Sequence, residues 1–212
     1  MIDYSPIVHV SFSSPFMDNS TYQETILANN HKEQYKDVYI VTTNLCFDSN
    51  GLIQLIEHGE YTNNRGVNII RIRTHRRPDR SRGNVIGLYK TLCKIKPNFI
   101  MDHGLCITSG LAISLYKIKN KECKVVADSH MTKANYSTGL KSRVYCFLQR
   151  LVGKVYYEFC DKIYGITSQT VGLLIEHLGV PRDKTERLLL GYDEKYIDLS
   201  PKKHERFVTG KV

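Results

Sequence analysis

Several features that define whole classes of protein are missing from this 212-residue sequence. No run approaches the roughly 18 apolar residues of a membrane-spanning helix, and the first ten residues, which include Asp3, lack the apolar core of a signal peptide. The six cysteines form no CxxC pair and have no histidine close by at zinc-ligand spacing. Neither a disulfide framework nor a bound metal is therefore expected, and a reducing, cytoplasmic setting is favoured.

The composition of disordered and repetitive chains is also absent. Only 6 prolines and 14 glycines occur, while 42% of the residues are hydrophobic and 24% are charged. This is the balance of a globular protein. At this length one large domain or two small ones are expected, and such a chain buries about 70% of its unfolded surface without any staple.

Two phosphate-binding fingerprints, GxGxxG and GxxxxGK[ST], do not occur either. A dinucleotide site or a P-loop is therefore disfavoured. No RRM, KH, helix-turn-helix or zinc-finger pattern is present, although Tyr145, Tyr156 and Tyr157 stand near Arg150 and Lys154 in a way that would suit stacking on bases. Nucleic acid is the weaker hypothesis for a partner.

Positive charge is in excess, and most of the excess lies in one segment. The chain has 30 Lys and Arg against 21 Asp and Glu, a net charge of +9, and residues 65–82 alone hold seven arginines and one acid, a net +6. Such a segment points to an anionic partner, or it is a solvated loop. The candidate contacts in it are Arg71, Arg73, Arg76, Arg77, Arg80 and Arg82.

Short β-branched segments alternate with helical patterns along the whole chain. Strands are expected at 7–12, 38–42, 67–72, 99–101, 124–127, 162–166 and 185–190. Helices are expected from a capping box near Ser20, at 85–95, 105–116 and 140–159, and from a Ser168 cap to Leu178. This alternation predicts a Rossmann-like three-layer αβα sandwich with a mostly parallel sheet.

The longest expected helix covers residues 140–159. Its aliphatic and aromatic residues at helical spacing are expected to form the buried stripe, namely Val144, Phe147, Leu148, Leu151 and Val155. Arg143, Arg150 and Lys154 fall together on a flank about 100° away and are candidates for contact with an anionic surface.

The loops that follow strands are where ligands bind in parallel sheets. Loop 13–21 offers hydroxyl, amide and carboxylate groups beside a helix start, which would suit a phosphate or a sugar or would simply cap the helix. Residues 102–104 (Asp-His-Gly) and 128–130 (Asp-Ser-His) follow neighbouring strands, so their histidines would act together as acid, base or hydrogen-bond donor, or serve structure alone. Cys106, close to this region, is expected to be inert on an apolar helix face.

An ordered series in the second half resembles a known family. The series is Glu158, Asp161–Ser168, Leu173 or Leu174, Leu178–Pro181, Lys184, Gly191–Asp193 and Tyr196. It resembles the end of the N-terminal domain in GT-B glycosyltransferases of family 4 (glycosyltransferase group 1 type), which carry a strand preceded by acidic residues, a Ser-capped helix, Gly-Val-Pro, a lysine and a Gly-x-Asp turn. The resemblance covers essentially the whole chain.

That resemblance implies one lobe of a two-lobed enzyme whose first lobe receives the acceptor and whose second lobe holds the nucleotide sugar. It divides the chain into an acceptor-side domain, 1–200, and a segment, 201–212, that resembles the linker and first strand of the second lobe. The implied activity is transfer of a hexosyl group with retention of configuration, without metal or other cofactor, and we expect a fragment that is inactive alone. The alternative is a stand-alone α/β module that binds a nucleotide or an anionic polymer without catalysis.

The resemblance also implies roles for individual residues. His130 would lie near the transferring sugar or its leaving phosphate as a hydrogen-bond donor. The residues expected to border donor and acceptor are Asp18, Asn19, Ser20, Tyr22, Gln23, His103, Gly104 and Asp128. Many relatives act on lipid-linked or cell-surface glycans at the inner face of the membrane, so the basic residues above are expected to make peripheral contact with anionic lipid.

Overall fold

A computed structural model describes residues 4–18, 20, 22–74, 84–131 and 140–189 of the chain. Its strands are β1 (Ile7–Ser11), β2 (Val38–Thr43), β3 (Leu45–Phe47), β4 (Ile53–Leu55), β5 (Gly59–Thr62), β6 (Asn68–Ile72), β7 (Phe99–His103), β8 (Lys124–Ser129), β9 (Lys162–Gly165) and β10 (Thr185–Arg187). Its helices are α1 (Gln23–Gln34), α2 (Val85–Ile95), α3 (Ile107–Lys119), α4 (Leu140–Phe159) and α5 (Ser168–Leu173), followed by a π-helical turn η2 (Leu174–Leu178) and a 3₁₀ turn η3 (Arg182–Lys184). Every strand and helix predicted from the sequence is present.

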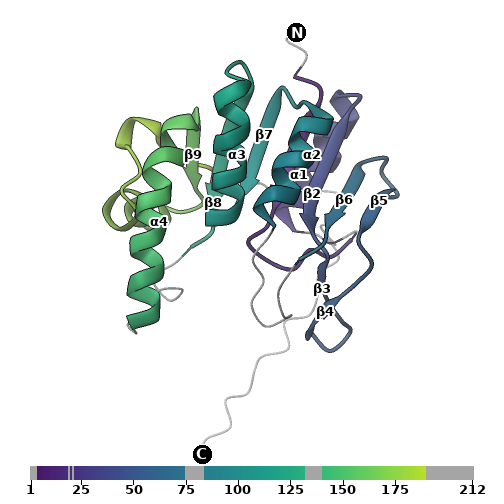
Figure 1. The fold of residues 1–212 in the computed structure, drawn as a ribbon, viewed down its shortest axis with the longest axis horizontal. Helices are drawn as coiled ribbons and strands as arrows, with labels where there is room; N and C mark the ends of the chain where they lie inside the picture. The colour runs from purple at the N-terminus through teal and green to yellow at the C-terminus, as the bar shows by residue number, and fades with distance from the viewer. Residues whose placement is uncertain (1–3, 19, 21, 75–83, 132–139, 190–212) are drawn as a thin grey trace, which may run out of the picture.

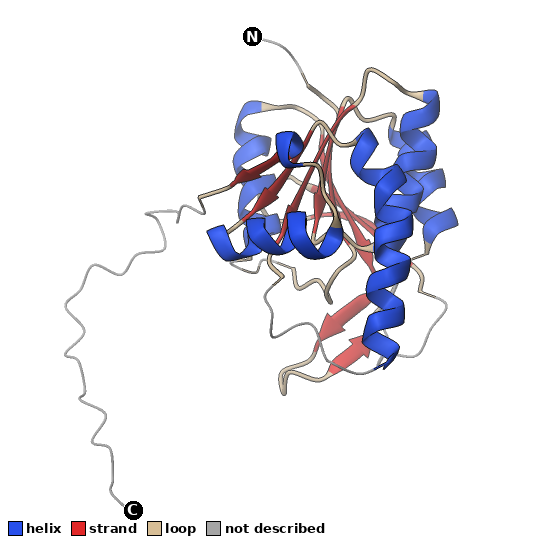
Figure 2. Cartoon of the chain, turned by 90° about the vertical axis from the view of Figure 1, so that its left-hand side faces the viewer, coloured by secondary structure: helices blue, strands red, loops and turns tan. Residues whose placement is uncertain are grey.

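One eight-stranded sheet organises the molecule, in the order β10-β9-β8-β7-β1-β2-β6-β5. All its neighbouring strands are parallel except β5, which pairs antiparallel with β6 at one edge. Helices cover both faces: α2, α3 and α4 lie on one side and α1 on the other (Figures 1 and 2). The predicted Rossmann-like αβα sandwich with a mostly parallel sheet is therefore confirmed.

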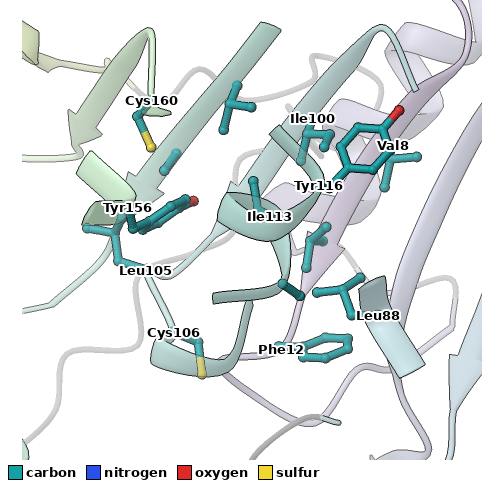
Figure 3. Close-up of a cluster of buried hydrophobic side chains, with 14 of the residues drawn as sticks. Val8, Phe12, Leu88, Ile100, Leu105, Cys106, Ile113, Tyr116, Tyr156 and Cys160 are labelled. Carbon is teal, nitrogen blue, oxygen red and sulfur yellow. The ribbon is translucent and has the colours of Figure 1, made fainter. Parts of the chain in front are cut away.

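The larger core lies between the sheet and helices α2 to α4. In β1 the side chains of Val8 and Val10 point into it, whereas Ile7 belongs to the smaller core under α1. Figure 3 shows that residues from distant parts of the chain meet there, with Ile100 and Ile113 between Tyr116 and Tyr156. Because both faces of the central strands are covered, most of their side chains are apolar in both orientations, which is why the sequence showed β-branched runs.

Three strands, β3, β4 and β5, were not predicted from the sequence. Strands β3 and β4 form a separate antiparallel pair, and β5 extends the sheet edge. All residues of β5 are exposed, and of the β3–β4 pair only Leu45 is fully buried. Short exposed strands carry neither an apolar run nor a clean alternation, so the periodicity on which the prediction rests is missing.

The ends of two helices differ from the prediction. Helix α1 begins at Gln23, and its N-cap residue, Tyr22, makes no capping bond, so the expected capping box at Ser20 is wrong. The Ser20 hydroxyl instead pairs with the Thr25 hydroxyl at 3.1 Å. Helix α5 is capped by Thr167 rather than Ser168, because the Thr167 side chain accepts the Thr170 amide at 3.0 Å.

The face of α4 that packs on the body is not the predicted one. Val144, Phe147, Leu148, Leu151 and Val155 are 47–61% exposed, which corrects the expectation that they form the buried stripe. Among the α4 side chains that the structure describes, the buried ones are instead polar, small or aromatic, namely Gln149, Gly153, Tyr156 and Tyr157. Tyr156 packs against Gly110 of α3, where an added Cβ would lie 2.8 Å from its ring. The aromatic side chains fill this space because the neighbouring helix has no side chain there.

Replacing Gly110 with alanine should therefore destabilise the fold by about 1–3 kcal/mol. The new methyl group would press on the ring of Tyr156, which is 3% exposed and has nowhere to move. The midpoint of urea unfolding would measure the change. Gly172, with open space around its Cβ position, supplies the control, and a Gly110→Ala variant as stable as Gly172→Ala would contradict this packing.

Candidate functional site

The sheet changes its winding direction at β1, which lies between β2 and β7. From β1 the chain proceeds through β2 to β6 on one side and later from β7 through β8 and β9 to β10 on the other. In open α/β sheets the crevice beyond the carboxyl ends at such a point is the usual ligand site. Register places Ser11, His103 and Asp128 next to one another at the ends of β1, β7 and β8.

Two of the predicted histidines meet the same carboxylate at this point. His103 Nδ1 lies 2.8 Å from Asp128 Oδ2, and His130 Nε2 lies 3.7 Å from Asp128 Oδ1. Asp128 is fully buried and His103 is nearly so, whereas the His130 side chain is 45% exposed. The imidazole of His130 is thus accessible to a ligand and lies next to the buried carboxylate of Asp128.

Polar atoms without partners gather in the segments at this edge. Ser11 Oγ, Asp128 Oδ1 and both polar atoms of the Gln23 side chain are buried and have no hydrogen-bond partner among the described residues. Ser11 ends β1, Gln23 begins α1 and Asp128 is near the end of β8. Buried polar groups are almost always satisfied, so unsatisfied ones at the end of a sheet suit a polar ligand.

A chain of histidines continues from this site under α1. His103 Nε2 lies 3.0 Å from His9 Nδ1, and His9 Nε2 lies 2.9 Å from His31 Nδ1. Since the Asp128 carboxylate accepts the proton on His103 Nδ1, each further contact is one N–H donated between rings, and its direction depends on the tautomers. His9 and His31 were missed from the sequence because one lies inside an apolar strand and the other on a helix surface.

The pKa values of these three hydrogen-bonded histidines are shifted in opposite directions. Burial lowers the pKa of His9 well below its ordinary value, and the charges of His103 and His31 lower it further. The pKa of His31 is lowered as well, by burial and then by His103. Burial also lowers the pKa of His103, but the charge and hydrogen bond of Asp128 outweigh it, so its pKa is raised. Of the three imidazoles, His103 therefore takes up a proton most readily, next to Asp128.

Replacing His9 with glutamine should make the fold less sensitive to acid. A group whose pKa is lowered by folding stabilises the fold above its unfolded pKa of about 6.5, and this stability is lost as the pH falls. Glutamine keeps a donor and an acceptor but does not titrate. The difference in Tm, wild type minus His9→Gln, should shrink between about pH 7 and about pH 5. The raised pKa values of His103 and Asp102 affect the wild type and His9→Gln alike. A Tm difference that grows as the pH falls would contradict a lowered pKa for His9.

The side chain of Asp102 lies on the face of the sheet covered by α3 and α4, opposite to that of His103. Its Oδ2 accepts hydrogen bonds from Ser109 Oγ at 3.0 Å and Tyr156 Oη at 2.7 Å, which ties β7 to α3 and α4. Burial raises the pKa of Asp102 to about 6, although these two hydrogen bonds oppose the shift. Asp102 therefore holds the helices in place and does not face the candidate site.

Gly104 brings two loops of the site into contact. Its φ of +98° favours glycine, and a Cβ at this position would lie 2.4 Å from the Ser13 side chain. The Gly104 amide donates to the Asp128 carbonyl at 3.0 Å. The loop after β7 thus lies between the loop after β1, at Ser13, and the end of β8, at Asp128.

Asp18 belongs to a second cluster, with Arg71 and Tyr61. Arg71 is only 2% exposed, so its prediction as a surface contact for anions is wrong. It forms an ion pair with Asp18 at 3.0 Å, donates to the Tyr61 hydroxyl at 2.7 Å and lies over the ring of Phe16. Burial raises the pKa of Tyr61 to about 12, so it stays a donor, and its hydroxyl donates to Asp18 at 2.6 Å.

The remaining predicted residues either lie outside the described part of the chain or are exposed. Arg76, Arg77, Arg80, Arg82 and Asn19 lie outside the described residues, as does the segment 201–212. Tyr22 and Arg73 are exposed at the start of α1 and after β6, and so are Arg143, Arg150 and Lys154 on α4. Arg150 Nη2 donates to the Glu176 carbonyl at 3.0 Å, which helps to cap the end of η2.

The described part of the chain has neither a metal-binding cluster nor a membrane span. There, no group of three or more His, Cys, Asp or Glu side chains has an arrangement that could hold a metal ion. None of the helices in that part combines the length and the apolar character needed to cross a bilayer.

The fold has counterparts among solved structures, although neither a family model nor a curated protein matches the sequence. The chain is similar to HepE of Anabaena in complex with UDP-glucose, with a TM-score of 0.54 and 8% identity over 88% of this chain and 44% of that one. It is similar to sucrose-phosphate synthase of Thermosynechococcus elongatus, with a TM-score of 0.55 and 12% identity over 89% of this chain and 49% of that one. The chain therefore spans about half the length of these proteins. It has the Rossmann-like fold of one lobe of the GT-B architecture.

Proposed function

We propose that the chain is the acceptor-side lobe of a retaining glycosyltransferase of family 4, of the hexosyltransferase type. It would transfer a sugar from a nucleotide-sugar donor to a glycan or a lipid-linked acceptor in the synthesis of a polysaccharide or glycoconjugate. One of the similar structures is HepE in complex with UDP-glucose, and another is a sucrose-phosphate synthase. The donor would be held mainly by a second lobe, and no cofactor beyond the donor is proposed.

The observation that carries the proposal is the supported imidazole at the winding point of the sheet. Asp128 is buried against His103, and its charge and hydrogen bond raise the pKa of that imidazole. The free Oδ1 of Asp128 faces His130 Nε2 at 3.7 Å, so a small rotation allows Asp128 to orient the His130 ring. Held through Nε2–H in this way, His130 as an imidazolium would donate its Nδ1–H to the sugar or to the phosphate oxygen on which negative charge grows as the glycosidic bond breaks.

The remaining polar groups at this edge would bind the reactants. The unpartnered atoms of Ser11 and Gln23 suit hydroxyl or phosphate groups, and Ser20 and Tyr22 lie beside them in the chain. The loop from Asp18 to Gln23 would border donor phosphate and acceptor, with Asp18 fixed by Arg71. Gly104 would keep the loop after β1 close to this edge, because the Ser13 side chain occupies the space that a Cβ would need.

Product stereochemistry tests this function. A protein that carries this chain together with its second lobe is incubated with nucleotide sugars and acceptors, and the anomeric configuration of the product is read by NMR. We expect configuration to be retained, and we expect the 212-residue chain alone to release no nucleoside diphosphate at an enzyme-like rate. Inversion would contradict the retaining mechanism, turnover by the isolated chain would contradict the half-enzyme proposal, and binding without transfer by the complete protein would favour the binding module.

The same proposal places the protein in the cytoplasm, at the inner face of the membrane. Its support is the excess of basic residues and the nature of a lipid-linked acceptor, which would be presented at that surface. Of the basic residues proposed for this contact, Arg73, Arg143, Arg150 and Lys154 are exposed.

A further inference from the structure

A row of three imidazoles connects the two edges of the sheet beneath α1. His31 lies in the last turn of α1 and contacts the ring of Phe99, the first residue of β7, with 6.3 Å between the ring centroids. His9 is in the middle of β1, and His103 ends β7 beside Asp128 at the candidate site. His31 is partly exposed, whereas His9 is 0% and His103 is 4% exposed. Solvent therefore reaches one end of the row, and the candidate site lies at the other.

The nitrogens of neighbouring rings in this row face each other directly. His103 Nε2 and His9 Nδ1 are 3.0 Å apart, and their ring centroids are 5.3 Å apart. His9 Nε2 and His31 Nδ1 are 2.9 Å apart, and their centroids are 5.0 Å apart. In both pairs the difference is about one ring diameter, so the two nitrogens lie close to the line that joins the ring centres. An imidazole N–H bond points outward along that line, so each contact is a nearly straight N–H···N bond, within reach of proton transfer.

The Asp128 carboxylate determines which nitrogen of each ring carries a proton. A carboxylate only accepts, so His103 Nδ1 is protonated and, while the ring is neutral, its Nε2 has a lone pair. His9 must then donate from Nδ1 and accept at Nε2, and His31 must donate from Nδ1. In the neutral state, therefore, all three rings are protonated at Nδ1. The lone pair left over is at Nε2 of His31, the partly exposed ring.

We propose that His31, His9 and His103 form a proton relay between the surface of α1 and the candidate site. A proton from solvent binds the lone pair of His31 Nε2, and the Nδ1–H bond of His31 breaks as its proton bonds to His9 Nε2. The Nδ1–H bond of His9 breaks in turn as its proton bonds to His103 Nε2. His103 is then an imidazolium between Asp128 and His9, while His9 and His31 are neutral and protonated at Nε2. One proton has been taken from solvent, no ring has rotated, and the reverse steps return it.

The charges around the relay draw the proton to the end at the candidate site. That end is influenced by three carboxylates, from β8, α1 and β7, namely Asp128, Glu24 and Asp102. Burial lowers the pKa of His103, but these carboxylates outweigh it and the pKa is raised. At the other end His31 packs against the rings of Tyr35 and Phe99, and burial lowers its pKa. Burial lowers the pKa of His9 as well, so His9 passes the proton on and does not retain it.

The relay lets the charge beside His130 change without access through the crevice. Asp128 is fully buried, and its Oδ1 lies 3.7 Å from His130 Nε2. While His103 is neutral, the negative charge of the carboxylate acts on His130 alone. Once His103 is an imidazolium, the pair is neutral overall and this attraction weakens. His9 and His31 would thus be positioning residues for His130, a consequence that rests on the proposed function, whereas the relay itself does not.

The protonation state of each ring can be read by NMR of the 212-residue chain labelled with isotopic nitrogen in its eight histidines. Ring-nitrogen spectra distinguish Nδ1–H, Nε2–H and imidazolium, and each signal is assigned by substitution of its histidine. As the pH falls from about 9 to about 5, we expect His103 to become an imidazolium. At the same midpoint His9 and His31 should change from Nδ1–H to Nε2–H and remain neutral. Imidazoles that only pack would titrate independently, so unchanged tautomers, or a proton gained by His31 at or above that midpoint, would overturn the proposal.

Substitutions interrupt the relay at either of two rings. Glutamine donates and accepts but does not titrate, so in His9→Gln the tautomer change of His31 should be lost while His103 still becomes an imidazolium. His31→Gln, at the partly exposed end, covers the case in which His9→Gln does not fold. It removes the entry point, so proton exchange at the buried His103 should slow and its ring-nitrogen signals should broaden. His58 is exposed between β4 and β5, and His58→Gln should alter neither result.

Two outcomes with these variants would contradict the relay. One is a tautomer change of His31 that persists in His9→Gln, and the other is proton exchange at His103 that is as fast in His31→Gln as in the wild type. All of these measurements are made without a nucleotide sugar or a second lobe. Failure of sugar transfer would therefore leave the relay intact, and failure of the relay would leave the proposed transfer reaction intact.

Discussion

Under the proposed function, replacing His130 with alanine should slow sugar transfer by about 10²–10³-fold in a protein that joins this chain to a second lobe. The expected loss follows from removing a hydrogen-bond donor that is aimed at the departing phosphate or the transferring sugar. His130 is partly exposed and its imidazole contributes little to packing, so the fold should survive. Steady-state kinetics with a saturating acceptor would show the loss mainly in kcat.

A histidine elsewhere on the surface provides the control. His58, between β4 and β5, is exposed, and His58→Ala should leave kcat unchanged. Asp128→Asn tests the positioning role, because the amide removes the charge that fixes His103 and faces His130. Its kcat should fall and the pH profile of kcat should change, whereas a residue that only supports the fold would lower Tm without altering that profile. Equal activity of His130→Ala and His58→Ala would remove His130 from the mechanism.

Replacing Arg71 with alanine should cost about 3–5 kcal/mol of folding free energy. The guanidinium is almost fully buried and binds Asp18, the Tyr61 hydroxyl and the carbonyls of Phe16 and Thr43 at 2.7–3.2 Å. Truncation removes this donor from all four groups, and among them Asp18 still accepts the Tyr61 hydroxyl. Urea unfolding monitored by circular dichroism would measure the change.

The neighbouring Arg73 is the matched control. It is exposed, and Arg73→Ala should change the unfolding free energy by no more than about 0.5 kcal/mol. Arg71→Lys should recover part of the loss, since lysine keeps the charge but lacks the planar fork that serves several acceptors at once. If Arg71→Ala were as mild as Arg73→Ala, Arg71 would be a surface residue after all.

The fold could be predicted because its central strands are buried on both faces. Such strands must be apolar in both orientations, so β1, β2 and β8 stand out as β-branched runs. Strand β5 is exposed along its whole length and gives no such signal. The orientation of α4 was predicted wrongly because the pattern favours burial of aliphatic residues, whereas α3 at Gly110 leaves room for Tyr156.

The candidate site could be predicted only where it follows the ends of strands. His103, Asp128 and His130 come directly at or after β7 and β8, so topology brings them together. His9 lies in the middle of a strand and meets them only because β1 and β7 are paired in register. Arg71 was assigned to a surface patch because the charge count of a segment does not show which of its residues end a buried strand.

An NMR titration with a nucleotide sugar tests most directly whether a ligand binds at the carboxyl ends of the strands, beside His130. At 24.4 kDa the protein is suited to amide NMR, and UDP-glucose can be titrated without a second lobe or an acceptor. We expect weak binding, with shift changes concentrated at Ser13, Gly104 and His130 and lost in His130→Ala but not in His58→Ala. Shift changes confined to the opposite edge of the sheet, near Asn98 and Asn120, or none up to saturating ligand, would contradict the account.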